Sequence, residues 1–135
     1  MKKIICLLAV ILLLASGCRR ASHNGKLDGF WRVETVEYLN AASGDSVAHP
    51  QNRFICIDLE LFQLQEHGGI QATGVMDYSK GKHLLKVDFP YFEAGGSPLL
   101  ERFGIMENPV TFLVSASGEK LVLSSTSTVV RCRRF

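Results

Sequence analysis

The side chains that could do chemistry are few and lie far apart in this sequence. Asp58 and Glu60 alternate with apolar residues, so they could form an acid/base pair or the polar outer face of a half-buried strand. Phosphate-binding loops, nucleophile elbows, His-Glu-x-x-His and Cys-x-x-Cys do not occur in the sequence. The four histidines are His23, His49, His67 and His83. No two of them have the i, i+2 or i, i+4 spacing that would place them on one metal-binding face. We therefore expect a non-enzymatic protein with no metal site and no cofactor.

The N-terminal segment has the layout of an export signal. Lys2 and Lys3 precede an uninterrupted apolar run of 11 residues from Ile4 to Leu14, well short of the roughly 20 residues that span a bilayer. Residues 14–18, Leu-Ala-Ser-Gly-Cys, resemble the lipobox of bacterial lipoproteins. The resemblance implies that residues 1–17 are a removable signal peptide and that Cys18 is the lipidated first residue. An ordinary secretory signal with an incidental cysteine is the alternative.

The mature chain would be short and neutral. Without residues 1–17 it has 118 residues, a length that suits one domain, with 13 basic and 13 acidic side chains. This balance, with no long basic run, gives no reason to expect nucleic acid as a partner. Residues 18–28 are polar and predict a flexible tether. Arg19 does not resemble the aspartate that retains lipoproteins in the inner membrane, so we expect a lipid-anchored protein of the outer membrane that faces the periplasm.

Two thiols remain if Cys6 leaves with the signal and Cys18 carries lipid. In an exported, oxidising compartment Cys56 and Cys132 could form a disulfide. Alternatively, they lie apart as small buried hydrophobic side chains.

From residue 29 onward, apolar side chains recur every second residue, which predicts strands. Within residues 53–65 the alternation places Ile55, Ile57, Leu59 and Leu61 on one inward face. Turn residues lie at 67–69, 79–81 and 117–118. Residues 46–49 could add a short eighth strand to the seven that we predict over residues 29–39, 53–65, 70–78, 83–89, 109–115, 120–124 and 127–135.

One short helix interrupts the predicted strands. Ser97 can cap it, Pro98 suits the first helical position and Gly104 suits the end, so we predict a helix over residues 98–104. The resulting fold class is all-β, an antiparallel up-and-down meander of seven or eight strands, and closing it into a barrel removes both edge strands.

The start of the first predicted strand, Gly29-Phe30-Trp31, resembles the Gly-x-Trp signature of the lipocalins. The resemblance implies an up-and-down barrel over residues 29–135, closed at one end by Trp31 with an arginine of the last strand packed across it. Arg134 is the predicted partner, because alternation places it with Val130 and Cys132 on one face. Residues 100–108 and the final Arg-Arg-Phe also look like those of small lipocalin-like bacterial lipoproteins of unknown function.

Such a barrel would be a binding module, with its open end near residues 41–52 and 91–104. We expect a small apolar ligand there, in a pocket walled by Tyr78, Phe89, Tyr91, Phe92 and Phe103. The alternative is a solid barrel that binds another envelope protein, since eight strands leave little interior space. An internal void of several hundred cubic ångströms with a mouth would favour the ligand, and a filled interior would favour the adaptor.

The long connection before residue 53 contains a possible modification site. Asp45-Ser46-Val47 resembles the short acceptor motif for O-glycosylation of some bacterial lipoproteins, with Ser46 as the acceptor.

Overall fold

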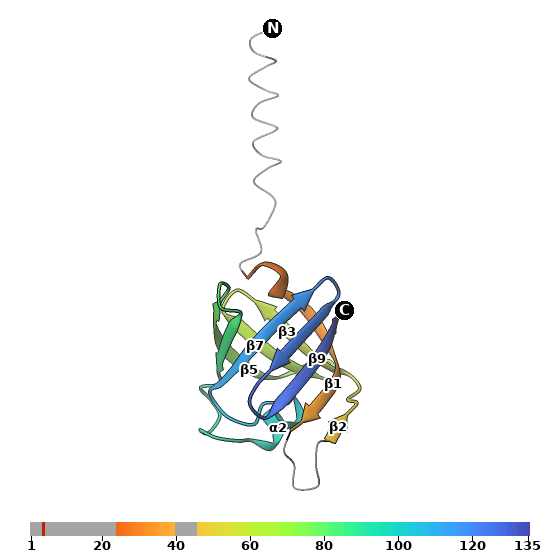
Figure 1. Ribbon diagram of the computed structural model, residues 1–135, viewed down its shortest axis with the longest axis vertical. Coiled ribbons are helices and arrows are strands. Elements are labelled where there is room, and N and C mark those ends of the chain that lie inside the picture. The colour runs from red at the N-terminus through yellow and green to blue at the C-terminus, as the bar shows by residue number, and fades with distance from the viewer. Residues whose placement is uncertain (1–3, 5–23, 40–45) are drawn as a thin grey trace.

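The computed structural model describes residues 4, 24–39 and 46–135. Cys18, Asp45 and most of the predicted signal peptide lie outside these residues. Figure 1 shows the described strands wrapped into a barrel, with the 3-10 helix η1 (Gly25–Leu27) at one end and the helix α2 (Pro98–Arg102) at the other. The strands are β1 (Gly29–Tyr38), β2 (Ser46–Ala48), β3 (Arg53–Asp58), β4 (Leu61–Glu66), β5 (Gly69–Ser79), β6 (Leu84–Asp88), β7 (Val110–Ser117), β8 (Lys120–Ser124) and β9 (Thr128–Arg134).

The barrel closes through pairing of β1 with β9. The strands from β3 to β9 pair antiparallel in chain order, and β9 returns to β1 in a register that runs from Trp31 opposite Arg134 to Tyr38 opposite Thr128. On its other edge β1 pairs with β3 over Gly29–Arg32 and with β2 over Val36–Tyr38. Eight strands therefore close the barrel and β2 is an added ninth strand. The predicted antiparallel up-and-down barrel with one short helix is confirmed.

The predicted single strand over residues 53–65 is wrong, because a hairpin divides it. Asp58 pairs with Leu61, so Leu59 and Glu60 form a two-residue loop, and Leu59 has a φ of 56°. The loop changes the alternation: Ile55 and Ile57 point into the core as predicted, but Leu59 and Leu61 are exposed. Asp58 and Glu60 are also exposed at this turn. They belong to the outer polar surface and do not form an acid/base pair in a pocket.

A second departure follows from a bulge in β5. Gln65 faces Ile70 and Leu64 faces Ala72, so Gln71 is an extra residue opposite this pair. Ala72, Gly74 and Met76 point inward, whereas Ile70, on the other side of the bulge, is exposed.

Apolar side chains fill the interior of the barrel. A side chain that lines a water-sized void keeps accessible surface toward it, yet the inward side chains of every barrel strand retain almost none. Among the described residues, 0% of the surface is accessible at Trp31, Val36, Phe62, Leu64, Leu85, Val87, Phe89, Leu121, Leu123 and Val130. Phe62 packs edge-to-face with Phe89 and stacks with Phe112, at centroid separations of 6.3 and 6.5 Å. The interior is thus a packed core of the kind that eight strands enclose.

The η1 end is closed by a tryptophan and an arginine that hold backbone carbonyls. The Arg134 Cζ lies 4.2 Å from the centre of the Trp31 ring. Trp31 Nε1 donates to the Leu27 carbonyl at 3.0 Å, and the Arg134 guanidinium donates to the carbonyls of Lys26 and Asp28, each at 3.0 Å. Leu27 is 1% exposed.

Residues 24–28, which we expected in the tether, therefore belong to the folded domain. Asn24 is buried, and its side chain donates to Asp28 and to the Leu59 carbonyl, which joins the start of the described chain to the β3–β4 turn.

Replacement of Arg134 by alanine removes the cation over Trp31 and two hydrogen bonds to η1. We expect Arg134→Ala to lower the free energy of unfolding by about 2 kcal/mol and to change Trp31 fluorescence, measured by urea titration. Arg133→Ala is the matched control, because Arg133 is exposed and pairs only loosely with Glu34, at 3.9 Å. Equal stability of the Arg134→Ala and Arg133→Ala proteins would contradict this account of the closure.

Candidate functional site

Helix α2 covers the barrel end opposite η1. It begins where the sequence predicted, with Ser97 at the N-cap position and Pro98 as its first residue, but it ends at Arg102, two residues before the predicted end at Gly104. Ser97 makes no side-chain capping hydrogen bond, so Pro98 and the packing of α2 define its start. Leu100 and Phe103 have no exposed surface and belong to the hydrophobic core.

Gly104 lets the chain leave α2 close to the barrel wall. Its φ is +81°, which side-chain-bearing residues rarely adopt. A Cβ at this position would lie 2.5 Å from Cγ2 of Val130 and 2.9 Å from Cγ1 of Val36. The Gly104 carbonyl accepts a hydrogen bond from the buried Thr128 hydroxyl, which fixes the exit of α2 against β9.

A buried carboxylate holds α2 to the barrel rim. The Glu66 side chain is 9% exposed and lies 3.3 Å from Nε of Arg53 and 3.4 Å from Nη2 of Arg102. Arg53 also donates to the Arg102 carbonyl at 2.9 Å, and its Cζ lies 5.9 Å from the centre of the Phe103 ring. His67 Nε2 is 3.7 Å from the same carboxylate. Because a buried charge is costly without partners, this cluster couples β3, β4 and α2.

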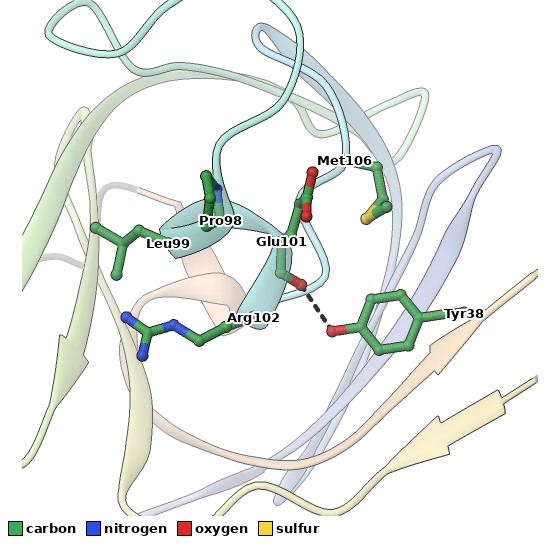
Figure 2. A pocket seen from close by; sticks show the side chains of 6 residues that line it. All are labelled: Tyr38, Pro98, Leu99, Glu101, Arg102 and Met106. Carbon is green, nitrogen blue, oxygen red and sulfur yellow. Dashed lines mark hydrogen bonds between the residues drawn. The ribbon is translucent and has the colours of Figure 1, made fainter. Parts of the chain in front are cut away.

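A groove of about 480 Å³ lies on the outer side of α2, lined by Tyr38, Pro98, Leu99, Glu101, Arg102 and Met106. Figure 2 shows these side chains around the helix, with the Tyr38 hydroxyl donating to the Glu101 carbonyl at 2.7 Å. Burial raises the pKa of the Tyr38 phenol above 10.0, so the hydroxyl stays protonated at neutral pH. The groove combines apolar contact surface with one acidic and one basic side chain, which suits recognition and supplies no nucleophile paired with a base.

Two residues that shape this end were not predicted from the sequence. Asn108 is buried, and its side chain hydrogen-bonds both backbone groups of Phe89 and the carbonyls of Phe92 and Glu93. No local motif marks Asn108. Glu66 could have been found, since it continues the inward alternation of Phe62 and Leu64.

The five aromatic residues predicted to wall a pocket do not face a common cavity. Phe89 and Phe103 have no exposed surface, and Tyr91 is 93% exposed. Phe92 packs against Phe89 at 6.2 Å, whereas Tyr78 contributes to a different pocket near η1. By contrast, the structure brings Trp31 and Arg134 together.

Cys56 and Cys132 are free thiols on opposite faces of the barrel wall. Cys56 lies half-buried on the outer face of β3, and Cys132 is buried within the core. Burial raises the pKa of both thiols, with Asp58 contributing at Cys56 and Glu34 at Cys132, whose pKa reaches about 12. The structure thus has the arrangement of two separate thiols instead of the disulfide.

The remaining predicted sites lie at or beyond the limits of the described chain. Ser46 is exposed as the first residue of β2, next to the undescribed Asp45, so its glycosylation stays a prediction. Lipidation of Cys18 also stays a prediction.

Within the described ranges, no three His, Cys, Asp or Glu side chains gather as a metal-binding group. No helix of these residues has the length and apolar character to cross a membrane.

Comparison with known proteins agrees with the closed barrel. The crystal structure of a lipocalin-like protein from Bacteroides uniformis is similar with a TM-score of 0.61 and 21% identity, covering 82% of this chain and all of the other. The crystal structure of an uncharacterized protein from Bacteroides eggerthii has a TM-score of 0.60 and 15% identity, covering 80% of this chain and 98% of the other. No curated protein matches this chain.

The fold and the Trp31–Arg134 closure define a small protein of the lipocalin type. The model of the lipocalin-like domain family matches residues 12–135, and the chain belongs to this family.

Two glycines with positive φ test the crowding at Gly104. Alanine at Gly104 meets both backbone strain and contacts with Val36 and Val130, whereas Gly118, with a φ of 58°, has nothing within 4 Å of its Cβ position. We expect Gly104→Ala to cost more than about 2 kcal/mol of unfolding free energy and Gly118→Ala about 1 kcal/mol, measured by denaturant titration. Equal losses would indicate that only backbone strain matters at Gly104.

The two thiols predict a selective pattern of alkylation. We expect iodoacetamide to modify Cys56 slowly in the native protein and Cys132 only after unfolding, followed by peptide mass spectrometry. Because the thiolate reacts, the rate at Cys56 rises with pH through the neutral range, about tenfold per unit, until its raised pKa is reached. A peptide pair linked through Cys56 and Cys132 would show a disulfide and overturn this prediction.

Proposed function

We propose that the mature chain is a lipid-anchored, non-enzymatic adaptor of the bacterial cell envelope, which binds a partner protein through the groove beside α2. The filled interior is the observation that carries this proposal. A ligand inside the barrel would have to displace Phe62, Phe89 and the other interior side chains, which retain almost no accessible surface. Recognition must therefore use the outside of the molecule.

The position of the groove favours a macromolecular partner. It lies beside α2, at one end of the barrel. The described domain begins at the other end, at η1 (Figure 1). With Cys18 lipidated, the η1 end faces the membrane and the α2 end is directed away from it. The lipobox-like residues 14–18 support this anchoring, and Arg19 after the cysteine supports the outer membrane, facing the periplasm.

The groove surface suits a protein contact. Leu99 and Met106 provide apolar surface, while Glu101 and Arg102 offer charges of both signs at its margin. Exposed Tyr91 comes from the same connection between β6 and β7 and adds an aromatic side chain of the type enriched in interfaces.

A small apolar ligand is the second candidate, now placed in the groove instead of the barrel. The groove volume of about 480 Å³ is within the size range of small-molecule pockets.

Site-specific photocrosslinking in the native envelope tests the adaptor function. A photoreactive amino acid at Leu99 should give one discrete protein adduct, because this side chain lines the groove. The same group at Leu113, which is 56% exposed on the barrel wall, is the matched control and should give none. Leu99→Glu should abolish the adduct formed from a second groove position, Met106.

Native mass spectrometry of the same preparation separates the alternatives. Adducts of equal yield from positions 99 and 113 would contradict a specific protein interface. A retained small molecule with no protein adduct would instead favour the ligand function. The mass of the peptide that begins at Cys18 tests acylation independently of either result.

A further inference from the structure

A second pocket lies at the η1 end, separate from the α2 groove. Its volume is about 320 Å³, and it is lined by Asn24, Gly25, Lys26, Leu27, Tyr78, Lys80, His83, Val114 and Ala116. The half-buried Tyr78 and Ala116 thus lie beside two lysines and a histidine in one pocket.

The basic side chains of this pocket have no acidic partners in the part of the chain that the structure describes. The ion pairs among the described residues involve Glu34, Glu37 and Glu66. None of them involves Lys26, Lys80 or His83. Asp28, the acidic residue of the η1 segment, is bound by the backbone and side chain of Asn24, at 2.9 and 2.6 Å. No described carboxylate therefore forms a direct ion pair with Lys26 or Lys80.

The walls of the pocket are preformed. Gly25 has a φ of +62° and leaves room for Lys80, whose Nζ would lie 3.2 Å from a Cβ at this position. His83, with a φ of 55°, is held by hydrogen bonds from its own N–H to the Lys80 carbonyl and from Val114 N–H to its carbonyl. The Arg134 guanidinium fixes η1 from behind through the carbonyls of Lys26 and Asp28.

The pocket lies only a few residues along the chain from the predicted lipid anchor. Asn24 lines it, and Cys18 precedes Asn24 by six positions. A chain extends by at most about 3.6 Å per residue, so a lipidated Cys18 lies within roughly 22 Å of the pocket. This step rests on the lipid anchor of the proposed function.

We propose that this pocket binds an anionic membrane lipid, with the negatively charged headgroup against Lys26 and Lys80 and the adjoining apolar part of the lipid against the half-buried Tyr78 and Ala116. Binding would hold the barrel upright on the membrane, with α2 directed away from the surface. Lysines beside an anionic membrane gain attraction that falls off within a Debye length, so the closely placed pair gives preference for anionic over zwitterionic lipid.

The test uses the mature, acylated protein in phosphatidylcholine vesicles that contain a photoactivatable lipid, either phosphatidylglycerol or phosphatidylcholine. We expect the phosphatidylglycerol probe to crosslink to peptides containing residues 24–27, 78–83 and 114–116, with several-fold higher yield than the phosphatidylcholine probe. Lys80→Gln should lower this yield by roughly fivefold.

Lys82→Gln is the matched control. Lys82 belongs to the same β5–β6 connection and is exposed like Lys80, but it does not line the pocket, so we expect its yield to stay within about twofold of the unmodified protein. Equal loss in both variants would indicate general surface charge and overturn the pocket. Equal crosslinking by both probes would also overturn it.

Competition with phosphate, intact mass and NMR distinguish failure of the lipid site from failure of the lipid anchor. Loss of the crosslink in excess inorganic phosphate would identify a site for the free anion and overturn the lipid. Intact mass shows whether the chain is acylated, and an unacylated chain contradicts the anchor alone. For that chain, soluble dihexanoyl phosphatidylglycerol should still perturb the NMR signals of pocket residues more than dihexanoyl phosphatidylcholine does, and equal perturbation would overturn the proposal.

Discussion

Eight strands enclose a space that side chains can fill completely, and this limit governs the rest of the molecule. Trp31, Phe62, Phe89 and Phe112 occupy the interior with almost no accessible surface. A barrel packed in this way has the outer shape of a ligand-binding barrel, but its own side chains fill the interior. The two pockets that we propose as binding sites therefore lie at the two ends, where connections and not strands determine the shape.

The two ends are closed by different physical means. At the η1 end, donors on Trp31 and Arg134 capture backbone carbonyls of a segment too short to fold alone. At the α2 end, which also contains the buried side chains of Leu100 and Phe103, the Glu66 carboxylate is paired with Arg53 and Arg102. In the first closure, Trp31 and Arg134 donate to neutral carbonyl groups, whereas the second requires a buried negative charge to be kept paired.

The sequence predicted the features that depend on local chemistry. Alternation located the inward residues of β6, β7 and β8, and Gly68 and Gly118 marked hairpin loops because they tolerate positive φ. The β3–β4 loop was missed because Leu59 adopts positive φ without a glycine or asparagine to signal it. The role of Asn108 and the fixed position of η1 depend on residues 19 and 106 positions away, so no local pattern could predict them.

The pairing of β1 with β9 also has a kinetic meaning. Arg134 and Asp28 are joined across 106 positions of the chain, whereas β3 and β4 meet through a two-residue loop. Hairpins of the second kind form early, and the encounter of the distant ends, with its large loop-closure entropy, is the slow event. Lengthening a connection such as that between β6 and β7 would delay this encounter while leaving the native contacts unchanged. The contact between the chain ends that stabilises the folded barrel is thus also the contact whose formation limits the speed of folding.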